Sequence, residues 1–509
     1  MHKITSSGKF GFATLAALAV AAAVPVPANA QQFSVVYAFG PTPDGQGPRG
    51  SLTQGQDGNL YGLTIDGGTA GQGTLFSIAL PGKETVLDSF ASSVGGINCN
   101  TGLSVGSDGS FTGTCPNGQS PYNFGTIFNA NPAAGTLNTV HAFDGSDGQN
   151  PEVGRPILAA DGNYYGLTEE GGTNKGGTAF MITPTGAFST LYNFGGTTGD
   201  PTSPSGPLIQ GADGNFYGTA SAGGTLGGGA LFRMTSTGQI TVLHNFPAKS
   251  ATDGTAPMGG VAQTKNGALF GETFSGGASN LGTIYEIKKN GKEVVLHSFS
   301  SADRSSSPCD GLIVASDANL YGTAAACLGD NCGTSIIFEV TAKGVFSVLH
   351  QLDPATEGTK VSGPLFLDTN GTFYGTAETG GAGGVGTIYS LNTGLAPFAN
   401  LSQTSGSVGA TIGIYGQGFN AKTKVSFDGT QAKFTMVNAN YLQAVVPAGA
   451  SSGYVKVKSP SLKSLQVFTV TTPHGVRHAA ISHRTLSRHA AAKPPSSRLR
   501  AELTRPIVR

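Results

Sequence analysis

The sequence predicts an all-β protein in which residues 31–395 form a seven-bladed β-propeller and a small β-sandwich follows. Three observations support this fold class. One pattern recurs seven times at intervals of about 52 residues. The region begins with a strand that matches the end of the pattern, not its start. Finally, the chain has 79 glycines among 509 residues and only 11% charged residues, which is typical of turn-rich β structure.

The repeated pattern reads Asp-Gly-Asn-aromatic-Tyr-Gly, then Gly-Gly, then Gly-Thr-x-Phe, and ends in a Val-Leu-x-x-Phe strand. Its tyrosine position is held in turn by Tyr61, Thr112, Tyr165, Tyr217, Phe270, Tyr321 and Tyr374. Short β-type runs and glycine turns with a period of this size indicate a propeller or an array.

Each repeat supplies four short strands, as the fourth repeat shows. Its expected strands are 207–210, 216–219, 230–235 and 240–246. The Asp213-Gly214 turn between the first two favours a tight hairpin. Four antiparallel strands make one propeller blade, and neighbouring blades must stack to bury their apolar faces.

The two ends of the array predict that the ring is closed. Residues 33–39 match the fourth strand of the pattern, whereas the last repeat stops after its third strand, 386–391. The N-terminal strand is therefore expected to complete the seventh blade. Closure removes the exposed edge strands that promote aggregation.

Residues 1–30 have the features of a secretory signal peptide. Lys3 and Lys9 precede an apolar run over 12–24, and Ala28-Asn29-Ala30 is an A-x-A cleavage site. The mature chain is expected to begin near Gln31 and to be exported to the periplasm, the cell surface or the medium. No later stretch is apolar enough to predict a transmembrane span.

Residues 396–470 depart from the repeat and predict the strands of a small sandwich. They contain the elements Gly416-Gln417-Gly418-Phe419, Val425-Ser426-Phe427-Asp428-Gly429, Val446-Pro447-Ala448-Gly449 and Gly453-Tyr454-Val455-Lys456-Val457. These elements resemble an IPT/TIG domain, an immunoglobulin-like module. The resemblance implies a part that packs, spaces or binds and rarely catalyses.

Residues 471–509 form a basic tail, with eight Lys or Arg against Glu502 alone. With the tail and residues 1–30 set aside, 31–470 keep 19 basic and 28 acidic residues, a net charge of about −9. The tail is expected either to contact anionic surfaces or to be a solvated, disordered extension. We favour the second interpretation.

Five cysteines are consistent with an oxidising compartment. Cys99 and Cys115 flank the first two strands of one repeat, and Cys309 and Cys327 hold nearly the same places in another. The pairs Cys99–Cys115 and Cys309–Cys327 are therefore predicted disulfides. Cys332 is the odd cysteine. It is expected either to replace Cys327 as the partner of Cys309 or to form a small loop with Cys327.

Histidines give little support for catalysis in the body of the chain. His141, His244, His297 and His350 hold one position of the fourth strand in four repeats. A residue that recurs with the fold is usually part of the fold, and this strand should be the outermost. The sequence therefore offers no evident His for a Ser-His-Asp triad or a zinc site.

Acidic residues in the loops are the candidate ligands. The loops between repeats and the Gly-Gly loops should share one face, which gathers Asp44, Asp147, Asp200, Asp253, Glu169 and Glu170. Such acids around a channel mouth are suited to Ca²⁺ or a cationic ligand, and Glu169 with a second carboxylate to glycoside hydrolysis. The interpretation that we favour is that they are turn residues, as the Asp-Gly hairpin aspartates are.

The repeat itself resembles the Gloeo/Verruco (GloVer) tandem repeat of bacterial exported proteins. The resemblance covers residues 33–391 in seven matching copies. It implies export but carries no assigned activity, so it assigns no catalytic residue. Members of that family often have a C-terminal anchor segment, whereas this chain ends in the basic tail.

These observations favour an exported, non-catalytic binding protein of the cell envelope or extracellular space, expected to be a monomer. The expected partner is a polysaccharide or other envelope polymer. Specific nucleic-acid binding is not expected, and neither is a cofactor other than Ca²⁺. The alternatives are a propeller enzyme that acts on glycans through carboxylates, as a hydrolase or lyase, and a structural surface protein. The absence of Trp weakens carbohydrate binding without removing it.

Overall fold

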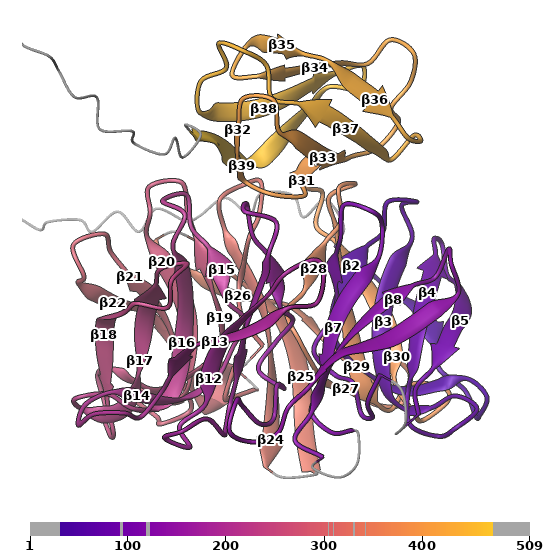
Figure 1. Ribbon diagram of the computed structural model, residues 1–509. Coiled ribbons are helices and arrows are strands. Elements are labelled where there is room, and N and C mark those ends of the chain that lie inside the picture. Colours follow the sequence, from indigo (N-terminus) through magenta and orange to yellow (C-terminus); the bar gives the residue numbers. More distant parts are fainter. Residues whose placement is uncertain are drawn as a thin grey trace, which may run out of the picture. The chain divides into compact units, whose positions relative to one another are not determined.

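The protein is all-β in the computed structural model, which describes residues 31–91, 95–118, 123–303, 305–308, 310–328, 331–341 and 343–471 (Figure 1). Within these residues the only helical element is a 3-10 turn, η1 (Ser301–Asp303). The strands form nine sheets, and seven of them are built from residues 32–392. The predicted fold class is therefore confirmed at the level of an all-β repeat protein.

The first four sheets of residues 32–392 follow the repeats in chain order. The first contains β2 (Gly45–Gln54), β3 (Leu60–Gly67), β4 (Thr74–Ala79) and β5 (Lys83–Ser89). The second contains β6 (Ser104–Val105), β7 (Phe111–Cys115), β8 (Thr126–Asn131) and β9 (Thr136–Ala142). The third contains β10 (Ile157–Leu158), β11 (Tyr164–Thr168), β12 (Thr178–Ile182) and β13 (Phe188–Asn193). The fourth contains β14 (Pro201–Pro204), β15 (Ile209–Gln210), β16 (Phe216–Gly223), β17 (Gly227–Met234) and β18 (Ile240–Pro247).

The remaining three sheets of this region continue the same order. The fifth contains β19 (Gly254–Gln263), β20 (Leu269–Gly276), β21 (Thr283–Ile287) and β22 (Glu293–Ser298). The sixth contains β23 (Ile313–Val314), β24 (Leu320–Leu328), β25 (Asn331–Val340) and β26 (Phe346–Gln351). The seventh contains β27 (Thr359–Val361), β28 (Phe366–Leu367), β29 (Thr372–Thr379), β30 (Thr387–Asn392) and β1 (Gln32–Ala38).

The N-terminal strand completes the seventh sheet, as its sequence indicates. β1 pairs antiparallel with β30, from Gln32 opposite Asn392 to Ala38 opposite Thr387. Beyond the strand, the amide of Phe39 donates to the carbonyl of Gly386 at 3.1 Å. The Phe39 side chain is fully buried. The first and last parts of the repeat region are therefore held in one sheet.

Hydrogen bonds join each repeat to the next and join the seventh repeat to the first. The pairs are Thr53 with Leu103, Ser104 with Pro156, Ala160 with Gln210, Ser205 with Pro257, Glu272 with Gly311, Asp310 with Gly363, and Asp368 with Gln54. The last contact, between the Gln54 amide and the Asp368 carboxylate, is 2.7 Å long and buried. The series of repeats therefore has no free end.

A residue with a left-handed backbone conformation recurs in the first segment of every repeat, 14 or 15 residues before the tyrosine position. The seven residues have φ between 53° and 63° and are Gly47, Asn98, Asn150, Ser203, Ala256, Ser307 and Lys360. Only one of them is glycine, although the left-handed region is costly for other residues. Seven occurrences at one repeat position show that the fold imposes this backbone conformation.

The Asp-Gly hairpins have a structural role, as predicted. Asp57 accepts hydrogen bonds from the Asn59 amide at 3.1 Å and the Tyr61 hydroxyl at 2.9 Å. The same aspartate–tyrosine bond joins Asp161 to Tyr165 and Asp213 to Tyr217, and it also joins Asp317 to Tyr321, where Ala318 replaces the glycine. The conserved spacing of the two residues within the repeat is thus explained by one bond per hairpin.

Residues 400–471 form the other two sheets, which enclose one apolar core. The first sheet contains β31 (Asn400–Leu401), β33 (Thr411–Tyr415), β37 (Tyr441–Val445) and β36 (Phe434–Met436). The second contains β32 (Ser405–Ser407), β39 (Leu462–Thr471), β38 (Gly453–Lys458), β34 (Lys424–Phe427) and β35 (Thr430–Ala432). Ile412 and Leu442 of the first sheet and Val455 of the second belong to the shared core.

A disulfide joins Cys99 to Cys115, as predicted, and both residues are fully buried. The second predicted pair lies outside the described residues, because neither Cys309 nor the side chains of Cys327 and Cys332 are described. The predicted signal peptide, 1–30, and the tail beyond Thr471 also lie outside them. In the part of the chain that is described, no helix is long and apolar enough to cross a membrane.

Replacing both Cys99 and Cys115 with Ala is expected to destabilise the fold by about 3 kcal/mol. The disulfide closes a loop with a sequence separation of 16 residues, and a loop of that length restricts the unfolded chain by about this free energy. The midpoint of urea unfolding measures the effect. An oxidised wild-type protein and a double variant with the same midpoint would contradict the expectation, and reductant should leave the variant's midpoint unchanged.

Candidate functional site

The loop aspartates identified in the sequence lie beside outer strands and not around a channel. Asp44 accepts a hydrogen bond from the Tyr37 hydroxyl at 2.9 Å, and Asp200 accepts one from Tyr192 at 2.8 Å. Asp147 lies 2.7 Å from Nε2 of His141. Each aspartate therefore contacts the strand that precedes it in the chain, which is the outer strand of a sheet. As Ca²⁺ ligands they stay a prediction, but the structure does not bring them together.

The other predicted site residues have three different environments. Asp253 lies near His244 and Glu293. Glu170 contacts the Gln149 amide at 3.1 Å in an exposed pair. Glu169 accepts a hydrogen bond from Asn150 at 2.9 Å, and burial, followed by the nearby charge of Glu152, raises its pKa. Of the six predicted residues, Glu169 alone lines the cavity described next.

The first segments of all seven repeats line one cavity. Six repeats contribute the residue two places after the left-handed position, namely Arg49, Asn100, Glu152, Ser205, Met258 and Ser362, and the sixth repeat contributes Asp310, three places after it. Nearly the same repeat position is therefore presented seven times to this space. Because its residue type changes from repeat to repeat, the lining is chemically diverse while the backbone is regular.

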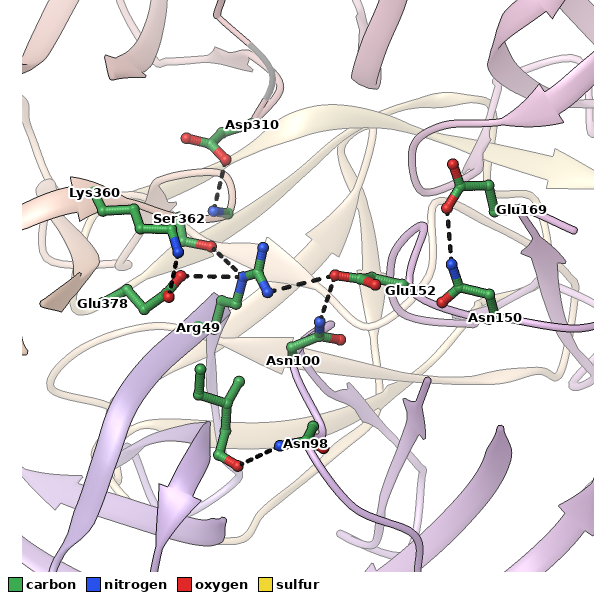
Figure 2. A network of polar contacts seen from close by, with 12 residues as sticks. Arg49, Asn98, Asn100, Asn150, Glu152, Glu169, Asp310, Lys360, Ser362 and Glu378 are labelled. Atoms are coloured by element: carbon green, nitrogen blue, oxygen red, sulfur yellow. Dashed lines mark hydrogen bonds and ion pairs between the residues drawn. The ribbon is translucent and has the colours of Figure 1, made fainter. Parts of the chain in front are cut away.

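Arg49 is the centre of a network of polar contacts in this lining (Figure 2). Its Nη1 lies 3.4 Å from Glu152 Oε1, which also accepts a hydrogen bond from the Asn100 amide at 2.8 Å. On the other side its Nε lies 3.3 Å from Glu378 Oε2 and 3.3 Å from the Ser362 hydroxyl. The guanidinium thus joins the first, third and seventh repeats, and Glu152 adds the second through Asn100.

Lys360 forms an ion pair with Glu378, the second carboxylate of this network. Its Nζ contacts Glu378 Oε1 at 2.6 Å, and the Glu378 side chain is only 7% exposed. Two cations, Arg49 and Lys360, therefore face two carboxylates, Glu152 and Glu378. The network is close to neutral, and its charges are largely satisfied by one another.

Two further carboxyl groups lie between the fifth, sixth and seventh repeats. Asp310 accepts hydrogen bonds from the Gly363 amide and the Thr323 hydroxyl, both at 2.9 Å, and burial raises its pKa to about 6. Glu272 is fully buried and accepts one bond, from the Gly311 amide at 2.9 Å. Burial raises the pKa of Glu272 to about 8, so this side chain is protonated at neutral pH.

Arg155 is a cavity residue that was not predicted from the sequence, as are Arg49 and Glu152. Its Nη1 donates to the Thr53 hydroxyl at 3.1 Å and to the Leu103 carbonyl at 3.2 Å, and no carboxylate of the described residues forms an ion pair with it. Burial lowers its pKa, yet a guanidinium remains charged. Arg155 is half-buried, and a charge partly removed from water without a counter-ion is costly, so it is a candidate for binding an anion.

A spacing signal for Arg155 is present in the sequence. Between the left-handed residue and the tyrosine position, the other repeats advance 14 residues, as from Gly47 to Tyr61, whereas the third advances 15, from Asn150 to Tyr165. The extra residue falls between Glu152 and Arg155, shortly before β10. Arg155 follows this insertion directly and lies on the cavity wall.

Comparison with known proteins identifies a repeat family. A model of the Gloeobacter/Verrucomicrobia repeat matches three overlapping stretches, residues 22–206, 98–263 and 203–435. No curated protein matches the chain.

Solved structures show only distant likenesses. A candidate gluconolactonase is 12% identical with a TM-score of 0.37, over 72% of this chain and 94% of its own. TolB from Acinetobacter baumannii is 13% identical with a TM-score of 0.38, over 62% and 67%. The extracellular domain of a candidate hybrid two-component system from B. thetaiotaomicron is 9% identical with a TM-score of 0.43, over 87% and 60%. Likeness at this level establishes neither a shared fold nor a shared function.

Proposed function

Because the chain belongs to the Gloeobacter/Verrucomicrobia repeat family, we propose that it is an exported binding protein whose repeats form a closed seven-bladed β-propeller. Residues 396–470 form an IPT/TIG, immunoglobulin-like module in this proposal. The seven sheets, the pairing of β1 with β30 and the two-sheet core of residues 400–471 support the architecture. The signal-peptide pattern of residues 1–30 supports export, and the basic tail is a second contact to anionic polymers.

The ligand that we propose is a carboxylate-bearing polysaccharide segment, bound in the cavity without turnover. Arg155 is the observation that carries the proposal, because it is a cation of the cavity wall that lacks a carboxylate partner among the described residues. Guanidinium groups bind carboxylates through charge-assisted hydrogen bonds. The amides and hydroxyls of the lining, such as Asn100 and Ser362, are suited to sugar hydroxyls.

A second candidate function is glycan cleavage, favoured by one pair of residues. Glu169 and Glu152 both line the cavity, and the pKa of Glu169 is raised by burial and by Glu152. A protonated carboxyl near an ionised one is the arrangement that glycosidases use as acid and base. In this alternative Glu169 is the acid, and Glu169→Gln abolishes product release.

The test compares binding of polygalacturonate and dextran to the purified protein and assays soluble oligosaccharides in the same samples. We expect retention on polygalacturonate, weaker binding at high salt, and no products. Arg155→Gln should weaken binding about 10- to 100-fold, because a charge-assisted hydrogen bond is lost. Arg155→Lys preserves the charge if the first variant folds poorly.

Arg233→Gln is the matched control, since it removes the same charge from another residue of the cavity lining. Equal weakening by Arg155→Gln and Arg233→Gln would show that net charge, not the Arg155 site, attracts the polymer. Retention of dextran at the same level would contradict an acidic ligand. Released oligosaccharide that disappears in Glu169→Gln would establish the second function instead.

A further inference from the structure

Four outer strands carry a histidine at one repeat position, and the contacts of three of them are alike. His141, His297 and His350 each stack on a phenylalanine that lies in the outer strand of the next sheet. The stacked pairs are His141 with Phe188, His297 with Phe346 and His350 with Phe33, with ring centroids 3.7 to 3.9 Å apart. Their Nε2 atoms lie 2.7, 3.3 and 2.8 Å from a carboxylate of the following loop. Here the histidine joins two sheets through an apolar contact.

The fourth histidine, His244, differs in both contacts. Glu293, the first residue of β22, stands where the other junctions have the stacked phenylalanine. Nε2 of His244 lies 3.6 Å from Glu293 Oε2 and 3.7 Å from Asp253 Oδ2, both too long for hydrogen bonds. Nε2 of His244 and Oε1 of Glu293 are buried and have no hydrogen-bond partner among the described residues. Nε2 of His297 also lacks one, but His297 has a single carboxylate nearby, Asp303, whereas His244 has two.

We propose that His244, Asp253 and Glu293 bind a divalent transition-metal ion of the Zn²⁺ class. One nitrogen and two carboxylate oxygens lie within 4.8 Å of one another, the one such group of three among the described residues. In a tetrahedral site with bonds of 2.0–2.1 Å, ligand atoms are about 3.3 Å apart. The observed 3.6 and 3.7 Å separations therefore need a contraction of only a few tenths of an ångström.

The donor set selects the metal. Ca²⁺ takes six to eight oxygen ligands, whereas imidazole with carboxylates suits Zn²⁺ and its neighbours. Three protein ligands leave a fourth position for water. The sequence offered no evident histidine for a zinc site, because the four histidines recur at one repeat position. Glu293, in place of phenylalanine, makes His244 different. Since His244 belongs to the fourth sheet and Glu293 to the fifth, the ion would bridge neighbouring sheets.

Metal content and affinity test the proposal on the full chain, which also carries four histidines beyond Thr471. Zn²⁺ binding is followed by equilibrium dialysis with metal analysis, and Co²⁺ is used as a spectroscopic probe of its coordination. The decisive variant is Glu293→Phe, because it restores the stacked pair of the other junctions and should therefore fold. It should lower the Zn²⁺ affinity of one site about 100-fold or more and abolish the Co²⁺ signal of a nitrogen–oxygen site.

Glu84→Gln is the control, because Glu84 holds the same repeat position at the first sheet but faces Tyr37 and Asp44 instead of a histidine. Zn²⁺ should also raise the melting temperature of wild type and Glu84→Gln but not that of Glu293→Phe. Equal Zn²⁺ stoichiometry and affinity in wild type and Glu293→Phe would overturn the proposal and assign the metal to other histidines. Absence of any Zn²⁺ uptake by wild type would overturn it as well.

Discussion

A chain that begins at Pro41, and therefore lacks β1, is expected to lose its cooperative unfolding transition and to aggregate. Without β1, the whole of β30 becomes an unpaired edge strand. Edge strands with free backbone groups invite pairing with other chains. The buried Phe39 is removed with the strand, together with the stacking of Phe33 on His350. The comparison is with the chain that begins at Gln31, by circular dichroism melting and size-exclusion chromatography.

Two point variants grade this effect. Phe39→Ala should destabilise the protein by about 4 kcal/mol, because truncating a buried phenylalanine leaves a cavity in the core. Ser34→Ala, at an exposed position of the adjoining strand β1, should stay within about 0.5 kcal/mol of wild type. A chain from Pro41 that remains monomeric and melts at the wild-type temperature would show that closure by β1 contributes little.

The fold was predictable because seven copies of each position report on the same environment. The strand 33–39 could be assigned to the last sheet, since it matches a pattern position that the last repeat lacks. The role of the Asp-Gly aspartates was equally readable, because Asp57 and Tyr61 keep a fixed spacing that one hydrogen bond explains. A strand predicted from seven equivalent segments is more secure than one predicted from a single short segment.

The placement of the loop acids was harder to predict, because the direction of a loop side chain depends on its partner. Asp44, Asp147 and Asp200 turn toward a tyrosine or histidine of the outer strand. The sequence does carry a sign of this pairing in the first repeat. There Asp88 replaces the Tyr or His of the outer strand, and the following segment, 91–100, contains no acidic residue. The outer-strand residue and the loop acid therefore vary together, which indicates that they are in contact.

The candidate functional residues are the departures from the repeat. Arg155 lies beside a one-residue insertion, Glu293 replaces the phenylalanine that stacks on histidine at other junctions, and Glu272 stands where other repeats have Leu or Thr. A consensus pattern omits such residues, because it records what the repeats share. Arg155 and Glu272 place a charged or ionisable group where the other repeats have neutral residues, so a stability cost accompanies each of them.

Glu272→Gln is expected to make the stability of the protein less dependent on pH between about 5 and 8. Glu272 is fully buried, its Oε2 accepts one hydrogen bond from Gly311, and its Oε1 has no hydrogen-bond partner among the described residues. Burial raises its pKa from 4.5 to about 8, with a smaller contribution from Asp310. Folding therefore takes up a proton between these two values, because the unfolded side chain is ionised where the folded one is not.

This proton uptake determines the direction in which stability changes with pH. The folded state binds more protons than the unfolded state, so the free energy of unfolding falls as the pH rises through the window, by about 1.4 kcal/mol per pH unit. From pH 5 to pH 8 the Glu272 contribution approaches about 4 kcal/mol, an upper limit set by a single carboxyl. Glutamine resembles the protonated form and has no such dependence.

Other buried carboxyls, such as Asp310, titrate in both proteins, so the informative quantity is the difference in unfolding free energy between wild type and Glu272→Gln, measured by urea unfolding at each pH. That difference should widen in favour of Glu272→Gln as the pH rises, and parallel profiles would show that Glu272 is ionised in the folded protein.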